Sequence, residues 1–269
     1  MSVSPESRQT EISPRDRRVR VSPQTILTTQ VLPVSAWTAA EMVRNWADEE
    51  IGRVACAANV HMVMEAWDDP AFAAALATAD LTFCDGRPLH LFCRLAGDRR
   101  AKHARGLDVM LMVCEIAVRH HLPIGLYGGQ PDVLAAVEKR LMAGYKDLDI
   151  VYRFSPPFRP LTDEEDAAQV DAIRSSGARI LFVALGCPKQ ETWMLAHRDR
   201  LPVTMLGIGA AVDFVTGAVQ PAGRLVQAAG LEWAHRLLRE PTRLWRRYAR
   251  TNSRFLVLAA AQLLRQRRL

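Results

Sequence analysis

Short apolar runs alternate along the chain with longer segments in which apolar residues recur at helical spacing. Strand-length runs occur at Thr25–Leu32, Arg53–Ala58, Leu81–Phe83, Pro123–Tyr127, Leu148–Arg153, Arg179–Leu185 and Val203–Gly207. Helical patterns lie between them, at Ala36–Ala47 (N-cap Ser35), Val60–Trp67, Pro70–Ala79, Leu89–Leu95, Asp108–Arg119, Pro131–Ala143, Asp163–Ser175 and after Pro188. This alternation predicts an α/β fold with a mostly parallel sheet flanked by helices on both faces.

Polar residues follow one of these strands in a way that is typical of a ligand-binding loop. The segment Ile180–Glu191 runs from a strand through Gly186 into a helix whose first turn contains Pro188. Parallel α/β sheets bind ligands at the carboxyl ends of their strands, where a helix N-terminus offers N–H groups to a phosphate. Lys189 and Gln190 would add a cation and an amide. An ordinary strand–turn–helix connection explains one such loop equally well.

Similar loops follow other predicted strands and contain further candidates. Asp85 is the best candidate for a general base, because a carboxylate in the turn with Gly86 can take a proton from an attacking hydroxyl. Asn59 can bind a substrate hydroxyl or orient Asp85, and its alternative role is a helix cap. The remaining candidates are glycines that permit close approach of a ligand and one acid beside them: Gly128, Gly129, Gly207, Gly209 and Asp213. Each of these turns also has an ordinary structural explanation.

Several common site types lack their residues in this chain. The seven histidines have no zinc-ligand spacing, and neither a P-loop nor a G-x-S-x-G sequence occurs. Asp147-Leu148-Asp149 matches the D-x-D metal motif of many sugar-nucleotide transferases, but it precedes a predicted strand instead of following one, so no metal site is expected. The five cysteines lack C-x-x-C spacing and lie mostly in apolar runs, which predicts buried free thiols in a reducing compartment.

Length and composition indicate a folded protein with one large domain. The 269 residues, of which 49% are hydrophobic and 24% charged, can bury a substantial core. We expect residues 1–20 to be a disordered leader, 21–222 to form the α/β domain with the candidate residues, and 223–269 to form a basic helical appendage. The start of the sequence has no apolar segment typical of a secretory signal.

The positive charge lies at one end of the chain. The net charge is +6, but residues 224–269 hold eleven arginines and two acids and carry +9, so residues 1–223 carry −3. Such an end suits a polyanionic partner: an anionic membrane surface, a diphosphate or nucleic acid. Phe255–Leu264 is apolar except for Gln262, is too short to span a bilayer, and can lie in a membrane interface. Alternatively, it packs on the body or on another subunit.

Taken together, these residues resemble the WecG/TagA/CpsF family of bacterial glycosyltransferases. The resemblance rests on short segments in the family's order across most of the chain. They are Asn59, Asp85-Gly86, Arg105-Gly106 with Asp108, Gly128-Gly129, Gly186-x-Pro188-Lys189-Gln190-Glu191, Gly207-x-Gly209 with Asp213-Phe214 and Gly217, and Leu231-Glu232-Trp233 through Arg236, Glu240-Pro241 and Arg243. The P-K-Q-E and E-W…R…E-P-x-R segments are the specific part.

The resemblance implies a Rossmann-like fold and an inverting, metal-independent transfer of a hexose or N-acetylhexosamine. The donor would be a UDP-sugar, with no further cofactor, and the acceptor a polyprenyl-diphosphate-linked saccharide at the inner face of the cell membrane. The aspartate matching Asp85 is the family's proposed base, with Asn59 in its pocket and Gln190 lining the donor site. The other substrate-binding positions implied are Gly86, His103, Arg105, Gly128, Gly129, Lys189, Glu191, Gly209 and Asp213, with Arg236, Arg243 and Arg246 from the appendage.

The chain departs from the family pattern at three places. Ala57 stands where a threonine is usual, which removes a hydroxyl from the pocket. His103 stands where an arginine is usual, and the R-A-P segment before the appendage reads Pro221-Ala222-Gly223. These changes leave the expected reaction type intact and bear on the identity of the sugar and the acceptor.

Two other functions stay open at this point. The chain could be a non-catalytic nucleotide-sugar-binding scaffold of a polysaccharide assembly complex, which would bind a UDP-sugar without turnover. A nucleic-acid-binding role for the basic end is weaker, because interleaved aromatic residues and a known binding motif are missing. The sequence leaves the oligomeric state open, and a homo-oligomer is compatible with it.

Overall fold

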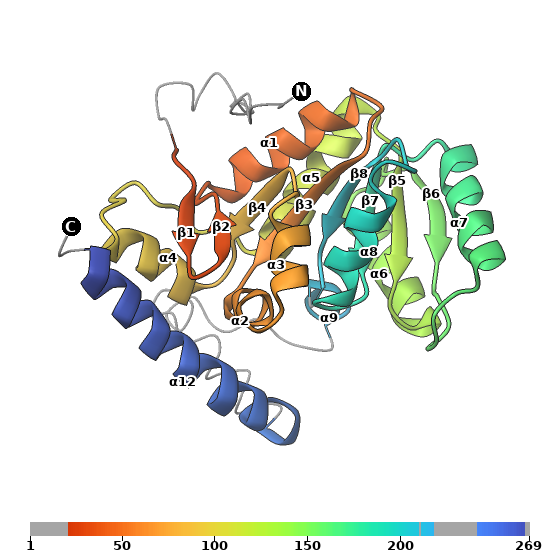
Figure 1. The fold of residues 1–269 in the computed structure, drawn as a ribbon. Coiled ribbons are helices and arrows are strands. Elements are labelled where there is room, and N and C mark those ends of the chain that lie inside the picture. Colours follow the sequence, from red (N-terminus) through yellow and green to blue (C-terminus); the bar gives the residue numbers. More distant parts are fainter. Residues whose placement is uncertain (1–20, 210, 218–240, 267–269) are drawn as a thin grey trace, which may run out of the picture.

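The structure is a computed structural model that describes residues 21–209, 211–217 and 241–266, with the side chains of 213 and 241–250 left undescribed. Its centre is a six-stranded parallel sheet with the order β4-β3-β8-β7-β5-β6 (Figure 1). The strands are β3 (Arg53–Ala58), β4 (Leu81–Cys84), β5 (Ile124–Gly128), β6 (Ile150–Phe154), β7 (Ile180–Ala184) and β8 (Thr204–Gly207). The predicted α/β class with a mostly parallel, Rossmann-like sheet is confirmed.

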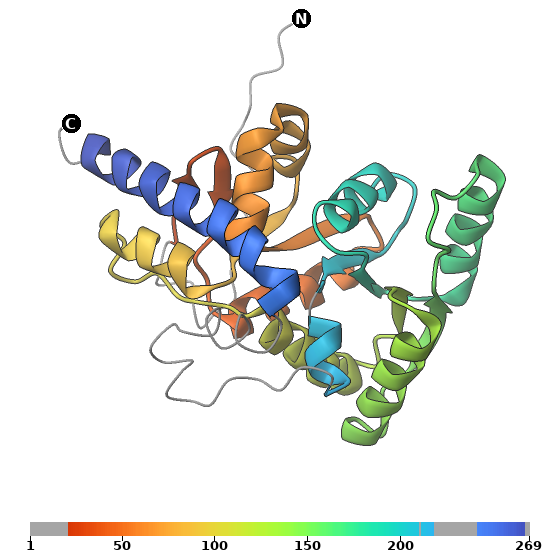
Figure 2. The same ribbon diagram turned by 90° about the horizontal axis from the view of Figure 1, so that it is seen from below.

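Helices cover both faces of this sheet, as Figure 2 shows. One layer contains α1 (Ala36–Ala47), α5 (Gly106–His120), α6 (Pro131–Gly144) and α9 (Ala211–Val215). The other contains α2 (Val60–Asp68), α3 (Pro70–Leu76), α4 (Arg87–Leu95), α7 (Asp163–Ser176), α8 (Lys189–His197) and α12 (Pro241–Gln266). Side chains of the central strands pack against both layers, because alternate residues point to opposite faces. Phe182 packs in the first layer and Leu181 in the second. This explains why the strands are apolar runs without alternation.

Side-chain caps explain where several helices begin. Ser35 Oγ accepts the backbone N–H of Thr38 at 3.1 Å, as predicted for the start of α1. Thr162 and Glu165 form a capping box at the start of α7. Predicted and observed boundaries differ by up to three residues, the largest difference being α3, which ends at Leu76 instead of Ala79. Pro188, expected in the first turn of α8, is its N-cap residue and follows a cis peptide bond.

The prediction of a single first strand at Thr25–Leu32 was wrong. The segment is an antiparallel hairpin of β1 (Gln24–Ile26) and β2 (Thr29–Val31), with Leu27 in the turn at φ 55°. Gln262 of α12 holds this turn from outside: its Oε1 accepts the N–H of Leu27 at 2.9 Å, and its Nε2 donates to the carbonyl of Thr25 at 2.8 Å. A local sequence pattern cannot reveal a turn that a residue so far along the chain stabilises.

Helix α12 lies along the outside of α2 and α4 (Figures 1 and 2). Its inner side contributes Phe255 and Ala259 to the core, and Arg254 forms a two-pronged ion pair with Asp68 at 2.6 and 2.8 Å. Pro241 is its first residue, and the segment before it lies outside the described residues, so the predicted break into two helices stays a prediction. Among the described residues, no helix is long and apolar enough to cross a membrane. Because Phe255, Ala259 and Arg254 contact the rest of the protein, the alternative that this segment packs on the body is confirmed for its inner side.

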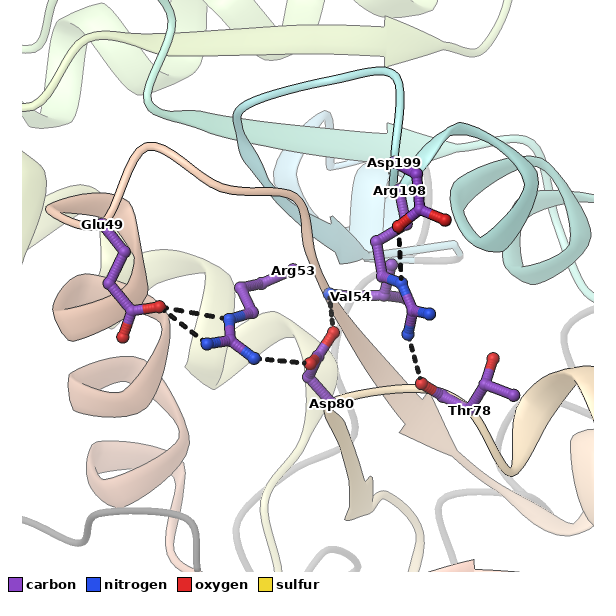
Figure 3. Close-up of polar contacts among 7 residues, drawn as sticks. All are labelled: Glu49, Arg53, Val54, Thr78, Asp80, Arg198 and Asp199. Carbon is purple, nitrogen blue, oxygen red and sulfur yellow. Dashed lines mark hydrogen bonds and ion pairs between the residues drawn. The ribbon is translucent and has the colours of Figure 1, made fainter. Parts of the chain in front are cut away.

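Asp80 ties the beginnings of β3 and β4 together (Figure 3). Its carboxylate accepts the backbone N–H of Val54 at 2.9 Å and a guanidinium N–H of Arg53 at 3.0 Å, and its side chain is only 6% exposed. Glu49 holds the same guanidinium from the solvent side. The two bonds of Asp80 fix which residues of the neighbouring strands lie side by side.

We expect Asp80→Asn to lower the free energy of unfolding by about 1–3 kcal/mol, because it weakens two hydrogen bonds of a buried carboxylate. Urea denaturation followed by circular dichroism measures this loss. Glu49→Gln is the matched control: its side chain is 40% exposed, and the loss should stay below about 1 kcal/mol. Equal losses in the two variants would contradict the role given to Asp80.

Candidate active site

The carboxyl ends of the six strands meet at one edge of the sheet, and most of the predicted site residues follow them. Register pairs Ala58 with Cys84 and Cys56 with Gly207, so the loops after β4, β3 and β8 lie in that order along the edge. The helix after β3 lies on one face and the helix after β8 on the other. Open α/β sheets bind ligands where neighbouring connections diverge in this way.

Asp85 lies at this edge, between the loop after β3 and the start of α5. Its backbone N–H donates to the carbonyl of Ala58 at 2.7 Å, which extends the strand pairing by one residue. A Cβ on Gly106, the first residue of α5, would lie 3.8 Å from Asp85 Oδ2 and 3.5 Å from the Cβ of Ala57. The carboxylate therefore faces a helix N-terminus, where the backbone dipoles favour negative charge. A Cβ at position 106 would make ordinary van der Waals contact with it.

His103 holds the turn that follows Asp85. Gly86 adopts a φ of 92°, which favours glycine, and its N–H donates to His103 Nε2 at 3.0 Å. A nitrogen that accepts a hydrogen bond carries no proton, so this imidazole is neutral. Burial lowers the pKa of His103 to about 4, and the positive charges of Arg87 and Arg105 contribute to the shift. At the position where an arginine was expected by resemblance, the chain thus has an uncharged acceptor.

Arg105 and Asn59 also lie beside Asp85, and both make structural contacts. Arg105 is bonded to Asp108 through Nε at 2.7 Å and Nη2 at 2.6 Å, so a carboxylate compensates its charge. Asn59 Oδ1 accepts the N–H groups of His61 and Met62, which confirms the helix-cap interpretation. The cap does not use the amide NH2 of Asn59. A Cβ on Gly86 would lie 4.0 Å from the Cβ of Asn59, so this side chain borders the Asp85 turn.

Gln190 reaches from α8 across the end of β8. Gln190 is 4% exposed, and its amide lies close to the backbone at Gly207 and Gly209. A Cβ on Gly207 would be 3.0 Å from Nε2, and a Cβ on Gly209 would be 3.4 Å from Oε1. The Gly207-x-Gly209 spacing therefore makes room for the Gln190 amide. Two strand spacings, about 10 Å, separate the end of β8 from the end of β4. Gln190 and Asp85 thus border one segment of the edge.

Gly128 and Gly129 are explained by the close passage of β7. A Cβ on Gly128 would lie 2.6 Å from the carbonyl oxygen of Ala184, and Gly129 donates its N–H to that oxygen at 3.0 Å. Ser155 Oγ donates to the carbonyl of Gly129 at 2.6 Å. Sequence reasoning missed Ser155, although it directly follows β6, and the rule that polar residues follow strands would have found it.

Other predicted residues are not gathered around Asp85 or lie outside the description. Lys189 is exposed and lies 6.0 Å from the ring centre of Phe158, in the loop after β6. Asp213 belongs to α9 and Arg243 and Arg246 belong to the first turns of α12, with their side chains not described. Arg236 lies outside the described residues.

All five cysteines are free thiols, four of them buried, as expected. In the described part of the chain, no cluster of three or more His, Cys, Asp or Glu side chains could hold a metal ion.

A hollow of about 560 Å³ lies at the opposite edge of the sheet, near the contacts in Figure 3. Four arginines line it, and each is bonded: Arg53 to Asp80, Arg174 to the carbonyl of Arg200, Arg198 to the carbonyl of Thr78, and Arg200 to Asp166. The carboxyl ends of α7 and α8 lie there, and such ends disfavour anions. We assign these arginines a structural role.

The neutral state of His103 predicts an acid sensitivity of the fold. The unfolded chain takes up a proton at about pH 6.5, but the folded chain does so only near pH 4, so stability falls as the pH drops through this window. Relative to His103→Gln, whose amide oxygen can still accept the N–H of Gly86, the wild type should lose up to about 1.4 kcal/mol per pH unit. Urea denaturation at several pH values measures this difference. Parallel pH profiles of the two proteins would show that His103 is not held neutral.

One comparison with known proteins identifies the family. The model of the Glycosyl transferase WecG/TagA/CpsF family matches residues 24–269, which is nearly the whole chain and includes the Asp85 turn, the P-K-Q-E segment and α12. The chain belongs to the WecG/TagA/CpsF family of glycosyltransferases.

Proposed function

We propose that this chain transfers a sugar from a UDP-sugar to a polyprenyl-diphosphate-linked saccharide, with inversion and with Asp85 as the general base. Membership of the family makes it a glycosyltransferase of cell-surface polysaccharide synthesis. The observation that carries the finer proposal is the convergence of Asp85, Asn59 and the Gln190 amide on one segment of the sheet edge. In the proposed reaction, the acceptor hydroxyl and the sugar nucleotide have to bind next to each other, and these residues lie along one segment of the edge.

In the proposed reaction, the acceptor hydroxyl oxygen attacks the anomeric carbon from the side opposite the nucleotide. The new C–O bond forms as the bond to the diphosphate oxygen breaks, the hydroxyl proton moves to Asp85, and UDP leaves with the electron pair. The amide NH2 of Asn59, which the helix cap leaves unused, is placed to orient the acceptor hydroxyl or the carboxylate.

Charge on the departing diphosphate has to be compensated by the protein. The N-termini of α2, α4, α5 and α8 all lie at this edge and offer backbone N–H groups. Arg236, Arg243 and Arg246 of the appendage would supply guanidinium groups, which bind phosphates through two parallel hydrogen bonds. In this proposal neither a metal ion nor another cofactor takes part, as the family resemblance implies.

The outer side of α12 supports an attachment to the inner face of the cell membrane. Leu256, Val257 and Leu264 are 63%, 70% and 59% exposed, and their spacing places them on one side of the helix. On the neighbouring α4, Leu91 and Leu95 are 57% and 47% exposed. Arginines flank this apolar strip, which suits the interface of an anionic leaflet. Such a peripheral position would bring the site to a lipid-linked acceptor.

Asp85→Asn should lower the rate of sugar transfer by about 10²–10⁴-fold, the usual contribution of a general base, and leave UDP affinity unchanged. Radiolabelled transfer from a panel of UDP-sugars to polyprenyl-diphosphate saccharides measures the rate, and calorimetry the affinity. Asp149→Asn is the matched control, because this exposed acid lies at the opposite edge, before β6; it also tests the D-x-D motif.

Full activity of Asp85→Asn would exclude Asp85 as the base. Binding of UDP-sugars by the wild type without turnover of any acceptor would favour the scaffold function instead.

Replacing Leu256, Val257 and Leu264 together with Gln should abolish flotation of the protein with vesicles that contain anionic lipid. The three side chains face solvent, so the fold and its melting temperature should be retained. Met142→Gln, which changes a 51% exposed residue on α6, is the control and should float like the wild type. Unchanged flotation of the triple variant would mean that this side of α12 does not contact the membrane.

A further inference from the structure

Two polar side chains at the start of α8 are buried together. Glu191 is 0% and Gln190 4% exposed, and Nε2 of Gln190 lies 2.6 Å from Oε1 of Glu191. The two remaining oxygens, Oε1 of Gln190 and Oε2 of Glu191, are buried and have no hydrogen-bond partner among the described residues. No Lys, Arg or His in that part of the chain forms an ion pair with Glu191. Glu191 is therefore an acid that is buried without a compensating cation.

The groups around Glu191 disfavour a negative charge on it. Its titratable neighbours are the thiols of Cys187, in the preceding loop, and Cys56, on β3, while the more distant Glu65 of α2 faces Cys187. Burial raises the pKa of Glu191, and the nearby donors, which are the Gln190 amide first and then the backbone N–H of Glu191 and the Cys187 thiol, only partly oppose this. A carboxylate buried without a cation costs far more free energy than a neutral acid.

The protonation state of Glu191 decides which end of the Gln190 amide points away from Glu191. A charged Glu191 accepts from the NH2 group, which turns the carbonyl oxygen away from Glu191. A Cβ on Gly209 would lie 3.4 Å from that oxygen and 3.5 Å from the amide nitrogen. A protonated Glu191 instead donates to the carbonyl oxygen, and rotating the amide by 180° achieves this without moving another group. The separation of 2.6 Å is normal for an O–H···O bond and short for N–H···O. In the second arrangement, the NH2 group points away from Glu191.

We propose that Glu191 is a positioning residue that stays protonated and donates to Gln190 Oε1, so that Gln190 presents two N–H donors to an acceptor oxygen of the sugar nucleotide. The nature of this ligand rests on the proposed function, and the protonated pair does not. A pair locked in this way would bind oxygen acceptors and reject ligands that offer a donor at the same place. The buried acid thereby decides whether Gln190 offers hydrogen-bond donors or an acceptor to the sugar nucleotide.

Infrared difference spectroscopy of the ligand-free protein tests the proton directly. We expect the carbonyl stretch of a protonated carboxyl group at neutral pH, shifted in D2O and absent from Glu191→Gln. Glu65→Gln, which removes a partly exposed acid on the neighbouring helix, should keep the band. A wild-type spectrum without this band would overturn the proposal, whatever the activity of the protein.

The pH dependence of unfolding gives a second test. The unfolded chain releases the Glu191 proton above about pH 4.3, and the folded chain keeps it to higher pH, so stability is lost as the pH rises towards the folded pKa. Within this window, the unfolding equilibrium constant of the wild type should increase by up to about tenfold per pH unit relative to Glu191→Gln. Identical slopes in the two proteins would contradict a retained proton.

Affinity for UDP, measured by calorimetry, separates positioning from a merely structural role. Glu191→Gln can donate to Gln190 Oε1 in the same way and should bind within a few-fold of the wild type. Glu191→Leu cannot donate and should bind about tenfold more weakly, the usual effect of losing one well-placed hydrogen bond. Equal affinities of a folded Glu191→Leu and the wild type would overturn the positioning role. Because binding is measured, the result does not depend on whether the chain proves to be catalytic.

Discussion

The parallel register of β3 with its two neighbours is the constraint on which the candidate site depends. β3 pairs with β4 on one side and with β8 on the other, so Asn59, Asp85 and Gly209 are brought to one edge although they lie far apart in sequence. A shift by one residue would turn every side chain of a strand to the other face, bury polar groups and displace the loops. Asp80 at the amino edge fixes this register and thereby also the geometry of the opposite edge.

Glycines decide how closely the groups at this edge can approach one another. Gly128 lets β7 pass, and Gly207 leaves room for the Gln190 amide. Gly207 thus lies beside a candidate site residue. Gly128 is explained by backbone packing alone, so its place in the family pattern does not by itself make it a contact to substrate.

The sequence predicted the fold well because the central strands are buried on both faces. An apolar run of strand length next to a helical pattern has few other interpretations, and the predicted bounds of β3 agree with the structure residue for residue. The hairpin at Gln24–Val31 was missed, because its turn is held by Gln262 of α12. No local pattern contains that contact.

The strand-end positions of the candidate residues were predicted, but their burial and hydrogen bonds were not. Strand-end spacing located Asp85 and Gln190, because the polar residues after parallel strands must share an edge. It could not show that His103 accepts a hydrogen bond from Gly86, or that Glu191 is fully buried without a cation. Both facts depend on packing between segments distant in sequence, and packing decides protonation.

These charge states bear on where the chemistry would obtain its positive charge. Near Asp85, His103 is neutral and Asp108 compensates Arg105, so these two side chains add little net charge for a diphosphate. Residues 224–269 carry +9, and α12 holds part of that segment on the outside of α2 and α4. If UDP departs at this edge as proposed, Arg87 at the start of α4 and the arginines of the appendage are the remaining sources of compensating cations.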